Sequence, residues 1–283
     1  NKIMKNTIGV LIHCNQDTHI QREFQKAAEM DIFSCQLCVW DQNVIRSERA
    51  AKEIADASLE YGVDISLLWA GWSGPCEWNF TAGPSTIGLV PPAYRFQRLQ
   101  ELRNASDFAA WLGVDQVATH VGFLPENPDD SEFSGTVSAL RNLCRYMKSK
   151  EQYFLFETGQ ETPTTMLRTI EAIGCDNVGI NFDTANLILY GKANTLDALD
   201  TFGKYVMATH IKDGFYPTNG TGLGHEVPVG QGKANVPAVL ARLHELNYTA
   251  PLTIEREISG EEQIRDIRNT RQLLLDWMEK IPD

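Results

Sequence analysis

The chain has 283 residues, a length that suits one large α/β domain of about 250 residues, so we expect residues 1–283 to form a single domain. Acidic residues outnumber basic ones by 37 to 25, and the formal net charge of −12 argues against nucleic acid as a partner. No apolar run approaches the roughly 18 residues needed to cross a bilayer, so no membrane association is expected either.

The cysteine content predicts reduced thiols in a cytoplasmic protein. The chain has 6 cysteines, and they lack the repeated spacing of a disulfide framework or a zinc ribbon. Cys35 and Cys38 form a CxxC motif, but they lie in a strand-like run where positions three apart face opposite sides, which argues against a redox site. Because the chain begins at Asn1, an upstream leader that has been removed stays an open alternative.

Short apolar or β-branched runs alternate with longer helical patterns along the whole chain. The expected strands are Thr7–Ile12, Ser34–Val39, Asp64–Trp69, Gln116–His120, Tyr153–Glu157, Val178–Asp183, Val206–Ile211 and Leu252–Glu255. The expected helices are Ile20–Met30, Arg46–Tyr61, Tyr94–Leu112, Val137–Lys148, Pro163–Ile173, Thr195–Gly203, Val236–Leu246 and Glu261–Ile281. This alternation predicts a single (β/α)8 TIM barrel, with a doubly wound open sheet as the alternative.

Three long loops follow expected strands directly, at Gly71–Pro92, Gly122–Gly135 and Gly214–Ala234. Barrel enzymes build their sites from the loops at the carboxyl ends of the strands. One of these loops contains a GQG turn at 230–232, which superficially suggests a phosphate cradle. We interpret it instead as a turn into the seventh helix, with Asn235 as the N-cap.

Acidic and imidazole side chains end four consecutive expected strands: Glu157, Asp183, His210 and Glu255. In a barrel these ends converge within reach of one ion, and the oxygen and nitrogen donors suit a divalent metal. We expect Mn²⁺, with Mg²⁺, Co²⁺ or Zn²⁺ as alternatives. A single such residue is often a hydrogen-bonded polar group at the barrel mouth, but four in phase favour a metal site.

Several motifs resemble the xylose isomerase-like TIM-barrel superfamily of sugar phosphate isomerases and epimerases: FETG (156–159), NFDTAN (181–186), THIKD (209–213), VGQG (229–232) and LTIERE (252–257). The likeness runs over almost the whole chain. It implies that the four residues above bind one divalent metal. It also implies that Glu157 and Glu255 flank the reacting carbon of a sugar or sugar phosphate as acid/base partners.

The chemistry fits this resemblance. A carbon-bound proton beside a carbonyl becomes acidic when a metal polarises the carbonyl and stabilises an enediolate. One carboxylate can then remove the proton while a second carboxyl returns one. The sequence therefore predicts a metal-dependent isomerase or epimerase with Glu157 and Glu255 as its catalytic residues.

Further residues are expected to contact the substrate. His120 ends the fourth strand, and Lys212 shares the strand parity of the histidine two positions before it, so it should point inward. Asn186 stands where relatives of the ketose 3-epimerase type carry histidine, which weakens transfer of that activity. Glu226 lies in the loop after the seventh strand. The tryptophans expected to line a sugar-stacking wall are Trp40, Trp69 and Trp72.

Three alternatives stay open at this stage. Inosose and dehydroshikimate dehydratases resemble the same scaffold and begin with the same proton abstraction, so a metal-dependent lyase is the second interpretation. Endonuclease IV also resembles the chain, but its three zinc ions need additional histidines, and Asn186 stands at one of those positions. A sugar-binding barrel without activity is the third alternative. Relatives of this kind are commonly dimers or tetramers, so a homo-oligomer is expected.

Overall fold

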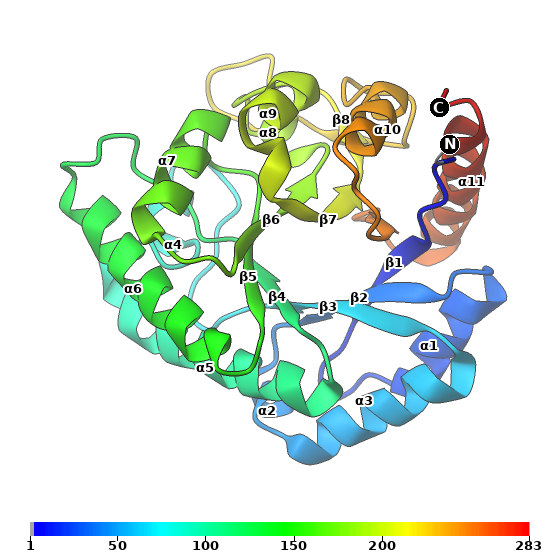
Figure 1. Cartoon of the computed structure of the whole chain (residues 1–283), viewed down its shortest axis with the longest axis horizontal. Coiled ribbons are helices and arrows are strands. Elements are labelled where there is room, and N and C mark those ends of the chain that lie inside the picture. Colours follow the sequence, from blue (N-terminus) through cyan, green and yellow to red (C-terminus); the bar gives the residue numbers. More distant parts are fainter. Residues whose placement is uncertain (1–2, 283) are drawn as a thin grey trace.

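The computed structural model describes residues 3–282, and within them eight parallel strands close into one barrel (Figure 1). The order around the barrel is β1-β10-β7-β6-β5-β4-β3-β2. The strands are β1 (Ile8–His13), β2 (Ser34–Val39), β3 (Asp64–Ala70), β4 (Gln116–Thr119), β5 (Tyr153–Glu157), β6 (Val178–Asp183), β7 (Val206–Ile211) and β10 (Leu252–Ile254). The predicted TIM barrel is confirmed, and the open-sheet alternative is wrong because β1 pairs with β10.

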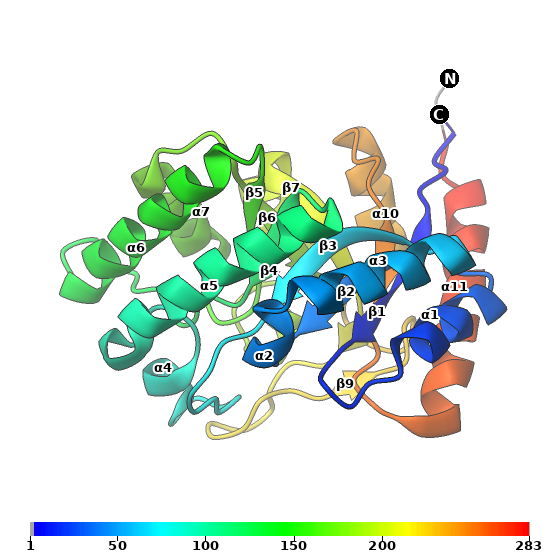
Figure 2. The same ribbon diagram turned by 90° about the horizontal axis from the view of Figure 1, so that it is seen from below.

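Helices surround the barrel and cover the outer face of the strands (Figure 1). The long ones are α1 (Ile20–Glu29), α3 (Glu48–Tyr61), α5 (Pro92–Leu112), α6 (Ser131–Lys148), α7 (Pro163–Ile173), α9 (Thr195–Phe202), α10 (Val236–Glu245) and α11 (Gly260–Glu279). Shorter elements lie in the loops: α2 (Gln42–Ile45), α4 (Gly83–Thr86), α8 (Asn186–Leu189), the 3-10 turn Gly203–Tyr205, and the hairpin β8 (Asp213–Gly214) with β9 (Glu226–Val227). Figure 2 shows α2, α4 and β9 at one end of the barrel, where the strands terminate.

The helix α6 begins six residues before the expected Val137. The reason is local, because the Asp130 carboxylate accepts a hydrogen bond from the backbone N–H of Glu132 and so caps the helix at Ser131. The periodic apolar pattern becomes regular only further along, so periodicity alone predicts a start that is too late. The short helices α2, α4 and α8 are not predicted by the sequence, since four residues are too few to show a period.

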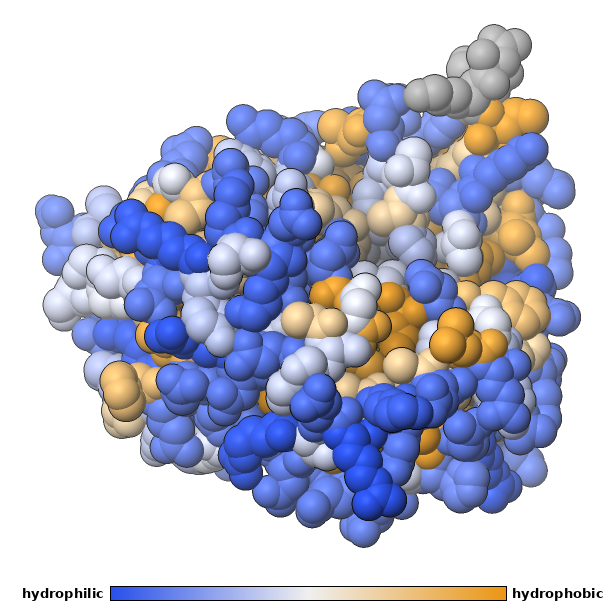
Figure 3. All heavy atoms as spheres, turned by 60° about the horizontal axis from the view of Figure 1, so that its bottom comes forward, coloured by the Kyte–Doolittle hydropathy of each residue, from blue (hydrophilic) through white to orange (hydrophobic). Residues whose placement is uncertain are grey.

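Two hydrophobic layers hold the barrel together. The large one lies between the strands and the helices, while a small one fills the interior with Cys38, Leu67, Trp69, Ala118, Leu155 and Ala208. All six cysteines are free thiols in this structure, as the sequence predicts. No helix within residues 3–282 is long and apolar enough to cross a membrane. The face in Figure 3 is largely hydrophilic, with hydrophobic side chains in small separate groups.

A buried guanidinium fixes the long loop between β3 and α5. The side chain of Arg98 is fully buried, and it donates hydrogen bonds of 2.6–3.0 Å to four loop carbonyls, those of Ser73, Pro75, Thr86 and Gly88. Its guanidinium also lies 4.1 Å from the ring centroid of Trp72. Since this loop contains Trp78, Arg98 sets the position of one wall of the barrel mouth.

Replacing Arg98 by Met is expected to lower the free energy of unfolding by about 3 kcal/mol or more. Hydrogen bonds from a charged donor contribute about 1.5–3 kcal/mol each, and the variant leaves buried carbonyls without a donor. Urea denaturation followed by circular dichroism measures the change. Arg49→Met is the matched control, because the Arg49 side chain is 89% exposed. A loss no larger than that of the control would contradict the role of Arg98 as a clamp.

The glycine turn after β7 is not a phosphate cradle, as the sequence indicates. The carboxylate of Asp213 fills it and accepts four backbone hydrogen bonds of 2.8–3.0 Å, from Gly214, Gly230, Gly232 and Ala234. Asn235 is the N-cap residue of α10, as expected, although its side chain makes no capping hydrogen bond. Its backbone is left-handed, with φ 52°, and carries the chain from the turn into the helix.

Candidate metal and active site

The four expected metal ligands meet at the carboxyl ends of four neighbouring strands. Glu157 and Asp183 are the last residues of β5 and β6, His210 is the penultimate residue of β7, and Glu255 follows β10 directly. The strand register places Asp183 directly beside His210. One potential ligand atom from each of the four lies within 4.8 Å of the others. The barrel thus gathers residues that are almost 100 positions apart in the sequence.

Three of the converging atoms are buried and have no hydrogen-bond partner within residues 3–282: Glu157 Oε1, Asp183 Oδ2 and His210 Nδ1. His210 Nδ1 lies 2.6 Å from Glu157 Oε1, and 3.6 Å from both Asp183 Oδ2 and Glu255 Oε2. None of the three makes a well-aligned hydrogen bond, although Glu157 Oε1 forms an ion pair with His210 Nδ1 and Asp183 Oδ2 lies 3.2 Å from the ammonium nitrogen of Lys212. A divalent cation satisfies them together, so this donor set fits a metal ion.

Gln36 sets the orientation of the His210 ring from the side opposite the carboxylates. Gln36 Oε1 lies 2.6 Å from His210 Nε2, and the side-chain amides of Gln36 and Asn181 pair reciprocally at 3.2 Å. We assign the ring proton to Nε2 because the carboxamide oxygen can only accept a hydrogen bond. Burial alone would lower the pKa of His210, but Glu157, Glu255 and Asp183 hold it well above its usual value, so Nδ1 carries a proton as well, and a divalent ion would take the place of that proton. A hydrogen bond of the kind that Nε2 makes to Gln36 is what fixes the tautomer of metal-binding histidines.

Lys212 points into the barrel and lies among three carboxylates. Its ammonium nitrogen is 3.2 Å from Asp183, 2.8 Å from Glu255 and 2.6 Å from Glu257. Burial alone would lower the pKa of Lys212, but these carboxylates overcome it and hold the pKa well above its usual value. Lys212 is therefore a charged, fully compensated group.

The two glutamates of the site differ in how they are held. Glu157 Oε2 accepts a 2.6 Å hydrogen bond from Trp69 Nε1 and lies 3.0 Å from His120 Nε2. Burial opposes ionisation of Glu157, yet His120 and His210 outweigh it and hold the pKa of this carboxyl well below its usual range. Glu255, by contrast, keeps one oxygen beside Lys212, and 15% of its side chain is exposed.

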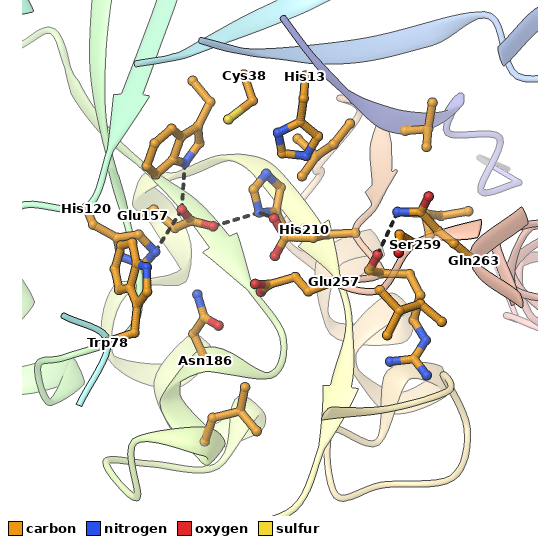
Figure 4. A pocket seen from close by; sticks show the side chains of 18 of the residues that line it. His13, Cys38, Trp78, His120, Glu157, Asn186, His210, Glu257, Ser259 and Gln263 are labelled. Carbon is orange, nitrogen blue, oxygen red and sulfur yellow. Dashed lines mark hydrogen bonds and ion pairs between the residues drawn. The ribbon is translucent and has the colours of Figure 1, made fainter. Parts of the chain in front are cut away.

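A cavity of about 610 Å³ opens above these groups. Figure 4 shows Glu157 joined to His120 and His210, with Trp78 on one side and Glu257, Ser259 and Gln263 on the other. The aromatic side of the cavity contains Trp40, Trp69, Trp78 and Tyr190. The cavity therefore offers an aromatic wall opposite a polar one, with the metal-ligand cluster between them.

The remaining residues expected to contact the substrate lie in different places. Asn186 lines the cavity, and its amide donates a hydrogen bond to the carbonyl of Thr158. Glu226 is not among the lining residues, and it forms an ion pair of 3.1 Å with Arg256, which does line the cavity. Trp72 is 3% exposed and packs behind Trp40, so its expected place in the aromatic wall is wrong.

Sequence reasoning missed three residues that shape the site: Gln36, Trp78 and Glu257. Gln36 lies on β2, far from its partner histidine in the chain, and only the closed barrel brings them together. Trp78 lies within a long loop, where no period indicates which tryptophan faces inward. Glu257 carried a detectable signal, since it has the same parity as Glu255 two positions before it.

A sequence model of the family described as "Xylose isomerase-like TIM barrel" matches residues 24–280. The chain belongs to this family. A xylose isomerase domain protein from Planctomyces limnophilus has a similar crystal structure, with 31% identity, 98% of both chains covered and a TM-score of 0.91. The predicted family is thus confirmed.

Two further similarities are more distant. An uncharacterized protein of Methanocaldococcus jannaschii is 25% identical over 205 residues, and the match spans 66% of this chain and 66% of that protein's length. The structure of 3-keto-D-glucoside 4-epimerase from E. coli has a TM-score of 0.74, with 17% identity over 96% of this chain and 100% of that one. At this level of identity the likeness shows the shared fold alone.

Proposed function

We propose that this protein is a divalent-metal-dependent enzyme that isomerises or epimerises a sugar by removing a proton beside a carbonyl. The observation that carries the proposal is the cluster of four potential ligand atoms, from Glu157, Asp183, His210 and Glu255, which lie within 4.8 Å of one another at the floor of a cavity of about 610 Å³. Family membership supports an enzyme of this class, although fold alone does not determine a reaction.

The metal would be held by the three carboxylates and His210, and when bound it supplies a Lewis acid for the substrate carbonyl. We propose Mn²⁺ as the ion. Gln36 keeps the imidazole of His210 in the tautomer that can bind it. Lys212 keeps the carboxylates in place on the other side of the cluster.

Glu157 and Glu255 act as the acid and the base of the proposed reaction. The Glu255 carboxylate is partly open to the cavity, so it can take or return a proton at the substrate carbon directly. The second oxygen of Glu157 is held by Trp69 and His120, which limits its basicity. We therefore propose that His120 and Glu157 act as one proton-holding pair on their side of the cavity.

Deuterium exchange tests the proposal directly. The Mn²⁺-loaded protein is incubated in D₂O with a panel of ketoses, ketose phosphates and keto-cyclitols, and label at carbon is measured by mass spectrometry. We expect one compound to gain a single deuterium beside its carbonyl, dependent on added metal. Loss of water from the labelled compound would assign the lyase reaction instead. An absence of metal-dependent exchange across the panel would contradict both.

A further inference from the structure

The positive groups around the cavity determine whether it can take a phosphorylated sugar. Barrel enzymes commonly bind phosphate in the loops after the seventh and eighth strands, with backbone N–H groups and cationic side chains. In this chain those loops follow β7 and β10, and the cations that they place at the cavity are Lys212 and Arg256, next to Asp213, whereas Lys233 is exposed and does not line the cavity. The state of each of these groups therefore bears on the substrate class.

The backbone cradle in these loops is already occupied. Both oxygens of Asp213 accept the N–H groups of the glycine turn, at 2.8–3.0 Å, and the carboxylate is 2% exposed. These are the N–H groups that would otherwise surround an anionic ligand. A phosphate group could bind there only by displacing a buried carboxylate of the chain.

Both cationic side chains are also compensated. Lys212 contacts Asp183, Glu255 and Glu257. Arg256 forms an ion pair of 3.1 Å with Glu226 and another of 2.9 Å with Asp266. A metal ion would neutralise Asp183 and Glu255, but Lys212 would still be paired with Glu257. The first turn of α11, the helix after β10, contains Glu261 and Glu262 and is acidic as well.

The charged side chains around the cavity sum to a negative net charge. The group holds six carboxylates and two cationic side chains, the carboxylates being Glu157, Asp183, Glu226, Glu255, Glu257 and Asp266. Even with His120 counted as positive beside Glu157, one divalent ion would leave the group with a net negative charge. Glu257 matters most, because it lines the cavity with 60% of its side chain exposed and points toward the space a substrate would fill (Figure 4).

We propose that the cavity selects an uncharged sugar and excludes its phosphate ester, and that Glu257 enforces this choice. The proposal rests on the proposed function for the identity of the ligand as a sugar. A phosphate dianion near Glu257 meets like charge with no uncompensated cation, and such juxtapositions are strongly unfavourable. An uncharged sugar can instead place its hydroxyl groups against the polar wall and its apolar face against Trp78.

The test compares the wild type with Glu257→Gln, both loaded with Mg²⁺, by calorimetric titration with inorganic phosphate, D-fructose and D-fructose 6-phosphate. The variant keeps the shape of the side chain but leaves Lys212 with one carboxylate fewer. We expect phosphate and the phosphate ester to bind the wild type at least about 30-fold more weakly than the variant. Glu279→Gln, an exposed change of equal charge at the far end of α11, should match the wild type.

The proposal is overturned if the wild type binds D-fructose 6-phosphate more tightly than D-fructose, or if phosphate binds equally to the wild type and to Glu257→Gln. Failure of the proposed function would look different, as an absence of deuterium exchange with every sugar of the panel. In that event the phosphate titrations still decide whether Glu257 excludes anions.

Discussion

Glu157→Gln and Glu255→Gln are each expected to lose proton exchange at the substrate carbon by about 10²–10⁴-fold while keeping at least part of their metal affinity. The glutamine oxygen can still bind the ion weakly, but the amide cannot act as a base. Deuterium exchange at saturating Mn²⁺ measures the loss, and elemental analysis of the purified variants reports the bound metal. For an epimerase that uses two bases, one variant is expected to exchange the proton of a single substrate epimer.

The control for these variants is Glu53→Gln, which removes one carboxylate from the exposed surface of α3 and should exchange at the wild-type rate. Because His120 contacts Glu157 at 3.0 Å, His120→Asn should reduce exchange on the Glu157 side alone. Near-wild-type turnover of Glu157→Gln or Glu255→Gln at saturating metal would contradict the two-glutamate mechanism. The base would then have to be His120, because three carboxylates hold Lys212 in its protonated form.

The strands could be predicted closely because their signal is local. Buried parallel strands are apolar on both faces, and four of them, β2, β5, β6 and β7, have the bounds that the sequence predicts. Their carboxyl ends then locate the polar residues that project into the barrel mouth. Glu157, Asp183 and His210 follow from this rule, so the amino-acid sequence alone is enough to predict the floor of the site.

The walls of the site could not be predicted in the same way. Whether Trp72 or Trp78 faces the cavity depends on the path of a loop that Arg98 holds from the opposite side. No local pattern encodes a contact between a helix residue and loop carbonyls 23 and 25 positions before it. The pairing of Gln36 with His210 likewise depends on closure of the barrel across 174 positions.

Lys212 shows that strand parity predicts the direction of a side chain but not the charges that surround it. Parity correctly predicts that its side chain points inward, and an inward lysine suggests a group that binds a substrate anion. The structure adds the three carboxylates that surround it, two of which, Glu255 and Glu257, lie beyond the end of β10. Charge compensation is a property of neighbours in space, so the same residue changes from an anion-binding candidate to a support for the candidate metal ligands.

His210→Ala is expected to weaken metal binding by at least about 100-fold, because removing even an outer hydrogen-bond partner of a metal ligand costs about 10- to 100-fold. A native state that binds an ion is stabilised by mass action, so the metal-dependent rise in Tm should shrink by about 5–10 °C. Thermal unfolding with Mn²⁺ and with EDTA measures this rise for each protein, which cancels any change in the stability of the metal-free fold.

Gln36→Leu is the graded comparison for that experiment. It leaves the imidazole in place but removes the 2.6 Å contact that fixes the proton on Nε2, so metal affinity should fall by about 10- to 100-fold, less than in His210→Ala. Asn181 does not replace that contact, because the atom 3.2 Å from His210 Nε2 is its amide nitrogen, which can only donate a hydrogen bond. If His210→Ala retains the metal content and the metal-dependent Tm rise of the wild type, the ion cannot lie among these four residues. The convergence of the Glu157, Asp183 and Glu255 carboxylates would then need another explanation.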